Sequence, residues 1–232
     1  MKKYVLFIVE GQNDKKEIQA ILRAACGQSF LESYVDAYHV HDGDITTETD
    51  TNEKSIVSKL NKIVISWRMG GEQPFQRIPV SDVARIIQII DTDGVFIPES
   101  AIKNTDDSKA RYTSNSICYY DRNIIIGRNR KKERVISKLL ETRLIDNIPY
   151  GLYFASCNMD HLLFDERNMI DKRRNAMLFA SRCKDRSDLS DSVLSPTICA
   201  TGTLIESWED IREGFNSLNR HTNINLFIED YS

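Results

Sequence analysis

The chain has 232 residues, of which 41% are hydrophobic and 28% are charged. These values are typical of a soluble globular protein with one large domain, or one domain and an appendage. Its formal net charge of −3 means that nucleic-acid binding would have to come from a local basic patch. No apolar run approaches the roughly 20 residues of a membrane span, so we expect no membrane partner. The five cysteines are scattered without a CxxC pair, which suits a reducing cytoplasm and argues against disulfides or a zinc site.

The first predicted elements are a strand and a helix. Residues 4–9 form a continuous β-prone run, as expected for a strand that is covered on both faces. After a turn, Asp14 is the expected N-cap of a helix, and Glu17 three residues later completes a capping box. Apolar residues then follow at helical spacing, and Gly27 is expected to end the helix.

Three further strands are expected at residues 34–40, 83–90 and 150–155, with a helix at 53–66 between the first two. Strands that alternate with helix-length crossovers predict an α/β fold, in which helices flank a mostly parallel sheet. In such open sheets, ligands bind at the carboxyl ends of the strands.

The stretch at about 95–127 interrupts this alternation. Residues 103–115 are polar and predict a mobile excursion, and the apolar runs within 117–126 suggest a hairpin. A helix with a basic start and an apolar stripe is expected at 128–144.

The last part of the chain differs in character. Beyond about residue 165 it becomes polar and helical, with a helix expected through 208–218 and a last strand at 224–228. We therefore expect an α/β domain over residues 1–164 and a mostly helical C-terminal extension over 165–232, packed on that domain.

Carboxylates follow two of the predicted strands. Glu10 comes directly after the first strand, and Asp91 and Asp93 end the strand at 83–90. Mg²⁺ prefers oxygen ligands and takes one or two protein carboxylates, which leaves sites for water and phosphate. Asp91 and Asp93 have alternate spacing and can share one ion. The sequence thus predicts a site for Mg²⁺ or Mn²⁺, with Glu10 either binding the ion or transferring a proton.

Glycines and basic residues accompany these carboxylates. Gly11 and Gly94 leave room for a phosphate to approach the backbone, and the helix N-terminus after Gly11 favours an anion. The most basic run of the chain is 128–134, and its candidates for binding nucleic-acid phosphates are Arg128, Arg130, Lys131 and Lys132. The alternative is an ordinary solvated helix face.

The two acidic motifs resemble those of Toprim domains. Residues 9–14, Val-Glu-Gly-Gln-Asn-Asp, resemble the opening glutamate motif, and residues 90–94, Ile-Asp-Thr-Asp-Gly, resemble the DxD motif. The resemblance covers roughly residues 4–160, and the spacing of the motifs also fits. It implies that Glu10 is a general acid or base and that Asp91 and Asp93 bind Mg²⁺.

The Toprim resemblance also implies a substrate and a setting. Toprim proteins include topoisomerases, primases, RNA-maturation nucleases and nucleases of phage-defence systems. The resemblance thus implies cleavage of DNA or RNA phosphodiesters, in phage defence or RNA processing, with a partner protein of a defence system as an option. The segment after the fourth strand is similar to that of stand-alone Toprim-like proteins, and an acidic ligand there would be Asp160. A helix-start acid is the competing interpretation of Asp160.

Two other functions compete with a nuclease. The run from Ile89 to Phe96 also resembles the first motif of haloacid-dehalogenase-type phosphatases, with Asp91 as nucleophile and Asp93 as general acid. That motif normally lies on the first strand of the core, which ranks this function second. The third option is a Toprim-like module that binds a partner or a nucleic acid without cutting it.

Overall fold

The computed structural model describes residues 4–27, 38–42, 45–48, 50–70 and 77–230. The strands of the described residues are β1 (Tyr4–Val9), β2 (Tyr38–Asp42), β3 (Val83–Asp91), β4 (Ile102–Asn104), β5 (Arg111–Tyr112), β6 (Ile117–Tyr119), β7 (Leu144–Ile145) and β8 (Ile148–Ala155). The α-helices are α1 (Gln12–Ala25), α3 (Ile56–Arg68), α4 (Arg122–Glu141), α5 (Met159–Phe164), α6 (Lys172–Arg182), α7 (Leu204–Asp210) and α8 (Ile224–Glu229). Short 3₁₀ turns lie at η1 (Val80–Asp82), η2 (Glu99–Ala101), η3 (Arg186–Leu189) and η4 (Asn216–Leu218).

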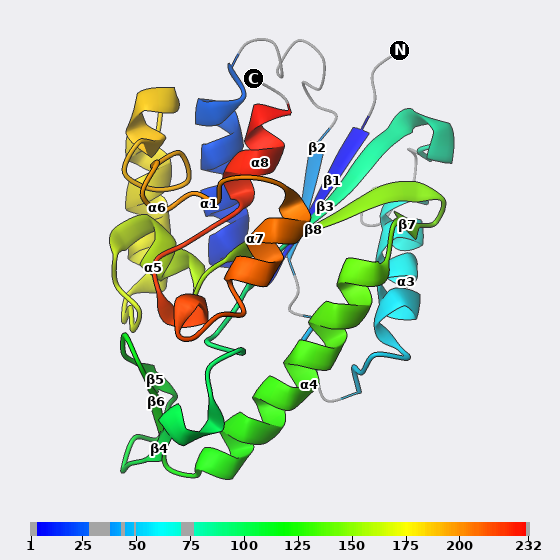
Figure 1. Ribbon diagram of the computed structural model, residues 1–232. Helices are drawn as coiled ribbons and strands as arrows, with labels where there is room; N and C mark the ends of the chain where they lie inside the picture. Colours follow the sequence, from blue (N-terminus) through cyan, green and yellow to red (C-terminus); the bar gives the residue numbers. More distant parts are fainter. Residues whose placement is uncertain (1–3, 28–37, 43–44, 49, 71–76, 231–232) are drawn as a thin grey trace.

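The main sheet has the strand order β2-β1-β3-β8-β7. β2, β1, β3 and β8 are parallel, and β7 pairs antiparallel with β8. The expected α/β fold is therefore confirmed as a mixed sheet flanked by helices (Figure 1). The strand expected at 34–40 begins at Tyr38 and continues to Asp42, and residues 34–37 lie outside the described residues.

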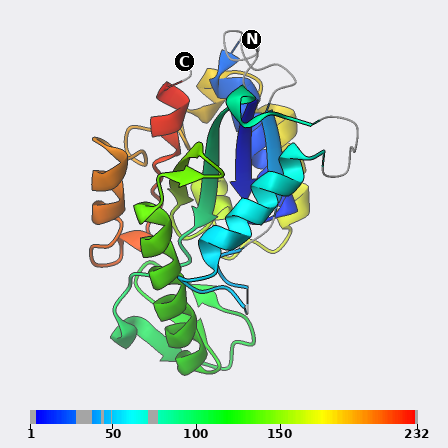
Figure 2. The ribbon, with the colours of Figure 1, turned by 90° about the vertical axis from the view of Figure 1, so that its right-hand side faces the viewer.

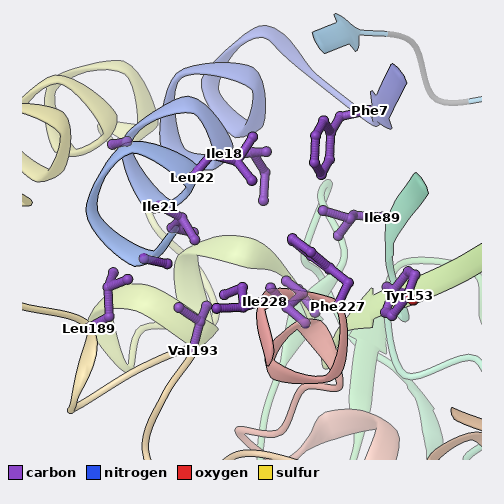
Figure 3. Packing of buried hydrophobic residues seen from close by; sticks show 14 of the residues in the cluster. Phe7, Ile18, Ile21, Leu22, Ile89, Tyr153, Leu189, Val193, Phe227 and Ile228 are labelled. Carbon is purple, nitrogen blue, oxygen red and sulfur yellow. The ribbon is translucent and has the colours of Figure 1, made fainter. Parts of the chain in front are cut away.

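Each face of the sheet is buried under its own helices. Along β1, Phe7 enters the core beneath α1, whereas Ile8 enters the opposite core with α3 and α4. α1 supplies Ile18 and Ile21 to the first core, in agreement with the predicted helical stripe. Figure 3 shows the first core, where the ring of Phe7 lies 5.6 Å from that of Phe227, measured between centroids.

The C-terminal segment completes this first core. Leu189, Val193 and Ile228 are fully buried in the same cluster as β1 and α1. The run 224–228, expected to be a strand, is the helix α8. Ile224, Phe227 and Ile228 have i, i+3, i+4 spacing, which places all three on one face of a helix but would split them between the two faces of a strand.

Two other predictions were wrong, one for a helix in the C-terminal segment and one for a hairpin in the excursion. The helix expected at 208–218 is the shorter α7, which begins earlier because Thr203 and Glu206 form a capping box. The hairpin expected over 117–126 contains only the strand β6. α4 starts at Arg122 because the Asp121 carboxylate accepts a hydrogen bond from the Asn123 N–H at 2.9 Å, which caps the helix.

The excursion forms a second, small sheet with the order β4-β6-β5. Ile102, Ile117 and Leu218 form a third buried cluster beneath it. In both Figure 1 and Figure 2 the small sheet and the start of α4 lie below the main sheet, beyond the carboxyl ends of its parallel strands. Among the described residues, no helix is long and apolar enough to cross a membrane.

Candidate functional site

The candidate site lies where β1 and β3 end side by side. The chain leaves β1 for β2 on one side and returns to β3 on the other, so α1 and α3 cover opposite faces of the sheet. A crevice at such a switch point is where open α/β sheets bind ligands. Glu10 follows β1 directly and Asp91 is the last residue of β3.

Lys132 links the predicted carboxylates. Its Nζ lies 2.7 Å from Asp93 Oδ2 and 3.3 Å from Glu10 Oε1, and only 1% of its side chain is exposed. Thr46 also donates to Glu10 Oε1, at 3.4 Å. The structure thus brings Glu10 and Asp93 to one buried ammonium group.

Asp93 is held from three sides. Besides Lys132, the Tyr112 hydroxyl donates to Asp93 Oδ1 at 3.1 Å, and Arg128 Nη2 donates to the Asp93 carbonyl at 2.9 Å. Burial alone would raise the pKa of the Asp93 carboxyl, but Lys132 and Arg128 outweigh burial and lower that pKa to about 2. Asp93 is therefore a stable carboxylate across the physiological pH range. Its φ of 52° turns the chain into Gly94 in the left-handed region.

Asp91 has the opposite electrostatic setting. Its Oδ1 accepts a hydrogen bond from the Met159 N–H at 2.9 Å, which ties the end of β3 to the start of α5. Desolvation raises the pKa of the Asp91 carboxyl well above its ordinary range, and the neighbouring charges of Glu10 and Asp14 raise it further. Asp91 therefore lies among carboxylates whose mutual repulsion a bound cation would relieve.

A second group of charges adjoins Asp91. Asp14 was expected to be the N-cap of α1, but Gly11 takes that position and Asp14 lies in the first turn of the helix. Burial raises the pKa of the Asp14 carboxyl to about 6, opposed by Lys172 and reinforced by Asp160. Asp160 is 5% exposed, and its Oδ2 lies 2.8 Å from Lys172 Nζ. Asp160 is thus at the edge of the site, paired with a cation from α6.

Glu17 is the least expected member of this group. It is 1% exposed, and its Oε1 has no hydrogen-bond partner among the described residues. Burial raises the pKa of the Glu17 carboxyl to about 9, and Asp14 and Asp160 raise it further. Glu17 is therefore protonated at neutral pH and does not form the expected capping box.

Sequence signals existed for some of these residues. Lys132 precedes Val135 and Ile136 by three and four residues, on the predicted buried stripe of the helix, so its burial could have been inferred. Glu17 precedes the buried Ile21 by four residues in the same way. The role of Tyr112 had no such signal, because it depends on how the excursion folds.

The basic run at 128–134 does not form one solvated face. Arg128 and Lys132 point into the site, as described above. Arg130 Nη2 lies 2.6 Å from Glu99 Oε1, and Lys131 Nζ donates to the Glu48 carbonyl at 2.5 Å. Two of the four basic residues predicted to bind phosphate, Arg128 and Lys132, thus belong to the acidic site itself.

The two glycines of the motifs differ in their surroundings. At Gly11 a β-carbon would make only ordinary contact, 3.4 Å from Asp14 Oδ2. At Gly94, where φ is +65°, a β-carbon would lie 2.6 Å from Leu218 Cδ2. Packing and backbone conformation therefore require glycine at position 94, whether or not a phosphate approaches it.

Within the described ranges, no three or more His, Cys, Asp and Glu side chains are grouped so that they could hold a metal ion as they stand. The positive charge between Glu10 and Asp93 comes from Lys132. No protein-family model matches the chain, and no curated protein or solved structure is significantly similar to it. The function must therefore be argued from the geometry of the site and from the motifs.

Proposed function

We propose that this chain is a nuclease that cleaves nucleic-acid phosphodiesters with Mg²⁺ or Mn²⁺, as its resemblance to Toprim domains implies. The observation that carries the proposal is that Glu10 and Asp91 lie at the adjacent ends of β1 and β3, and that Glu10 and Asp93 both contact Lys132. This is the switch point of the sheet, where a ligand has access to both strand ends. The resemblance to Toprim domains is the only support for a role in phage defence or RNA processing.

The donors match a hard divalent cation in chemical type. Carboxylate oxygens are the ligands that Mg²⁺ and Mn²⁺ take in proteins, and the pKa of Asp91 is raised in part by the other carboxylates. The ion would be held by Asp91, Asp93 and Glu10, in competition with Lys132, which contacts two of them. Asp160 is less suited to the ion because Lys172 pairs with it.

When bound, such an ion polarises a phosphodiester and lowers the pKa of a bound water. The protein's own side chains would transfer the proton and hold the carboxylates in position. Glu10, at the carboxyl end of β1, would accept or donate the proton that the reaction moves. Lys132, 3.3 Å from Glu10 and 2.7 Å from Asp93, would hold these two carboxylates in place. Tyr112 and Arg128 hold Asp93 in place.

The proposal is tested by incubating the purified protein with Mg²⁺ or Mn²⁺ and labelled single- and double-stranded DNA and RNA. We expect metal-dependent cleavage of at least one polynucleotide, and its loss in Asp91→Ala. Hydrolysis of p-nitrophenyl phosphate with every polynucleotide left intact would instead identify a phosphatase. Metal-independent binding without any hydrolysis would identify a non-catalytic module.

A further inference from the structure

A positively charged segment flanks the acidic site. Residues 99–134 contain nine Lys or Arg and five Asp or Glu, in a chain whose net charge is −3. Two of these cations, Arg128 and Lys132, contact the acidic site, and the remaining seven give the segment a net charge of +2. This segment comprises the small sheet and the first half of α4, which lie beyond the carboxyl ends of the main sheet (Figures 1 and 2). A polyanion attracted to the segment would therefore lie next to the site.

The small sheet is fastened to the site by specific hydrogen bonds. Arg128 Nη1 donates to the Tyr112 hydroxyl at 3.0 Å, and that hydroxyl donates to Asp93. The Asn168 side chain also pairs with the backbone of Tyr112, accepting from its N–H and donating to its carbonyl, both at 2.8 Å. A ligand held on the small sheet would thus keep a fixed position relative to Asp93.

The outer face of the small sheet carries two cations in register. Lys103 of β4 and Arg111 of β5 both pair with Cys118 of β6, from opposite sides. Residues in register across neighbouring strands point to the same face, and both cationic side chains are exposed. Arg111 contacts Asp107 at 3.3 Å, but its side chain remains 55% exposed. The arrangement offers two positive charges to a phosphate backbone.

Two tyrosines stand at the end of β6, and one of them is exposed. Tyr119 packs against the third buried cluster, and the ring of Tyr120 contacts the Tyr119 ring at a centroid distance of 4.5 Å. Tyr120 is 55% exposed, and its N–H is fixed by the Asp107 carbonyl at 3.0 Å. Tyr120 follows Ile117, the partner of Tyr112, by three residues, or about 10 Å of extended chain. The ring of Tyr120 thus stands beside the start of α4, and ten residues or about 15 Å of that helix separate Arg122 from Lys132 at the acidic site.

Rings and cations in this combination suit one class of ligand. Unpaired bases stack on aromatic side chains while the neighbouring phosphates contact Lys or Arg, a mode that depends little on sequence. A duplex keeps its bases paired and stacked, and offers only its phosphates to such a surface. We propose that Lys103, Arg111 and Tyr120 form a subsite for a single-stranded segment of nucleic acid, in which the ring of Tyr120 stacks on an unpaired base. This inference rests on the proposed function and specifies that its substrate is single-stranded where it passes over the small sheet.

The test is a fluorescence-anisotropy titration in EDTA, so that binding is measured without cleavage. The probes are single strands of one mixed sequence as DNA and as RNA, and the corresponding duplexes. The variants are Tyr120→Ala, Tyr120→Phe, which keeps the ring, and Ile124→Ala as a matched control. Ile124 is 47% exposed near the same end of α4 but offers no ring to a base.

We expect the wild type to bind a DNA or RNA single strand more tightly than the duplex. Tyr120→Ala should weaken that binding about 5- to 150-fold, the range that corresponds to loss of one base–aromatic stack. Tyr120→Phe and Ile124→Ala should remain close to the wild type. The inference is overturned if Tyr120→Ala binds as tightly as the wild type, if Ile124→Ala is weakened equally, or if the wild type binds no single strand.

Failure of the inference is distinguishable from failure of the proposed function. A wild type that cleaves with Mg²⁺, together with a Tyr120→Ala variant that binds normally, overturns only the subsite. A Tyr120-dependent single-strand affinity in a protein that cleaves nothing with any metal supports the subsite and removes the nuclease.

Discussion

Glu17 is a carboxylic acid that folding forces into its neutral form. Its pKa is about 9 in the folded protein against an ordinary value of 4.5. Between these two values the folded state binds the proton more tightly than the unfolded chain does. The stability that the folded protein gains from the protonated Glu17 is therefore complete below about pH 4.5, and it is lost as the pH rises through about 9.

We predict that Glu17→Gln stabilises the protein, and increasingly so with pH. The amide keeps the shape of the protonated acid and cannot ionise, so its advantage should grow by up to about 1.4 kcal/mol per pH unit between roughly pH 5 and pH 9. Urea unfolding at several pH values measures this difference. The exposed Glu213→Gln serves as control and should show no such growth. A Glu17→Gln effect independent of pH would contradict the assignment.

Lys132 is the buried cation on which Glu10 and Asp93 depend. Lys132→Met leaves these carboxylates without their ammonium partner, and we expect a loss of about 3 kcal/mol in the free energy of unfolding. Mn²⁺ should then raise the melting temperature of the variant more than that of the wild type, because a cation can replace the lost charge. Lys138→Met on the same helix, where the lysine side chain is 43% exposed, should change neither quantity. An equal Mn²⁺ response in Lys132→Met and wild type would contradict this role.

At the scale of elements, the loop after β3 is fixed by the packing of Gly94. Gly94→Ala combines a left-handed backbone with a contact of 2.6 Å to Leu218, so we expect a loss of roughly 2–4 kcal/mol in the free energy of unfolding. Gly127→Ala is the matched control, because it lies in α4 with nothing within 4 Å of the added carbon. That change should stabilise the helix by about 0.5–1 kcal/mol. Equal effects of the two substitutions on urea unfolding would refute the packing argument.

The regular elements could be predicted because their patterns are local. β1 is a continuous apolar run and lies where the sequence predicts it. The apolar stripe of α1 is also as predicted, although α1 begins at Gln12 and not after Asp14. α8 was missed because five apolar or amide residues are too few to separate the two periods by eye. The early start of α4 depends on a single cap, Asp121, within a polar stretch.

The only part of the site that could be predicted from the sequence is the part formed by the ends of the strands. Glu10 and Asp91 meet because parallel strands align their carboxyl ends, a rule that needs only the order of the elements. The contributions of Tyr112 and Lys172 come from the excursion and the C-terminal segment. Their positions depend on long-range packing, which no local pattern encodes.

At the scale of the whole molecule, the two ends of the chain share one core. Phe227 of α8 packs on Phe7 of β1 and on Tyr153 of β8. The segment after residue 164 is thus integral to the packing around the first strand, and it also carries Lys172 to the site.

We predict that Phe227→Ala costs about 3–5 kcal/mol in the free energy of unfolding, as expected for a buried phenylalanine. Phe215→Ala, where the ring is 36% exposed, should cost far less. The midpoints of urea unfolding compare the two variants. A single cooperative transition lowered strongly by Phe227→Ala indicates one shared core, and an unchanged midpoint would show that the C-terminal segment does not support the sheet.

The central claim is that a divalent cation binds between the ends of β1 and β3, and calorimetric titration with Mn²⁺ tests it most directly. The wild type should bind Mn²⁺ saturably, and Asp91→Asn should weaken that binding at least about tenfold, since it removes a charged ligand. Asp106→Asn, an exposed acid of the excursion, should bind like the wild type. Equal Mn²⁺ affinity in wild type and Asp91→Asn, or no binding by the wild type, would contradict the account.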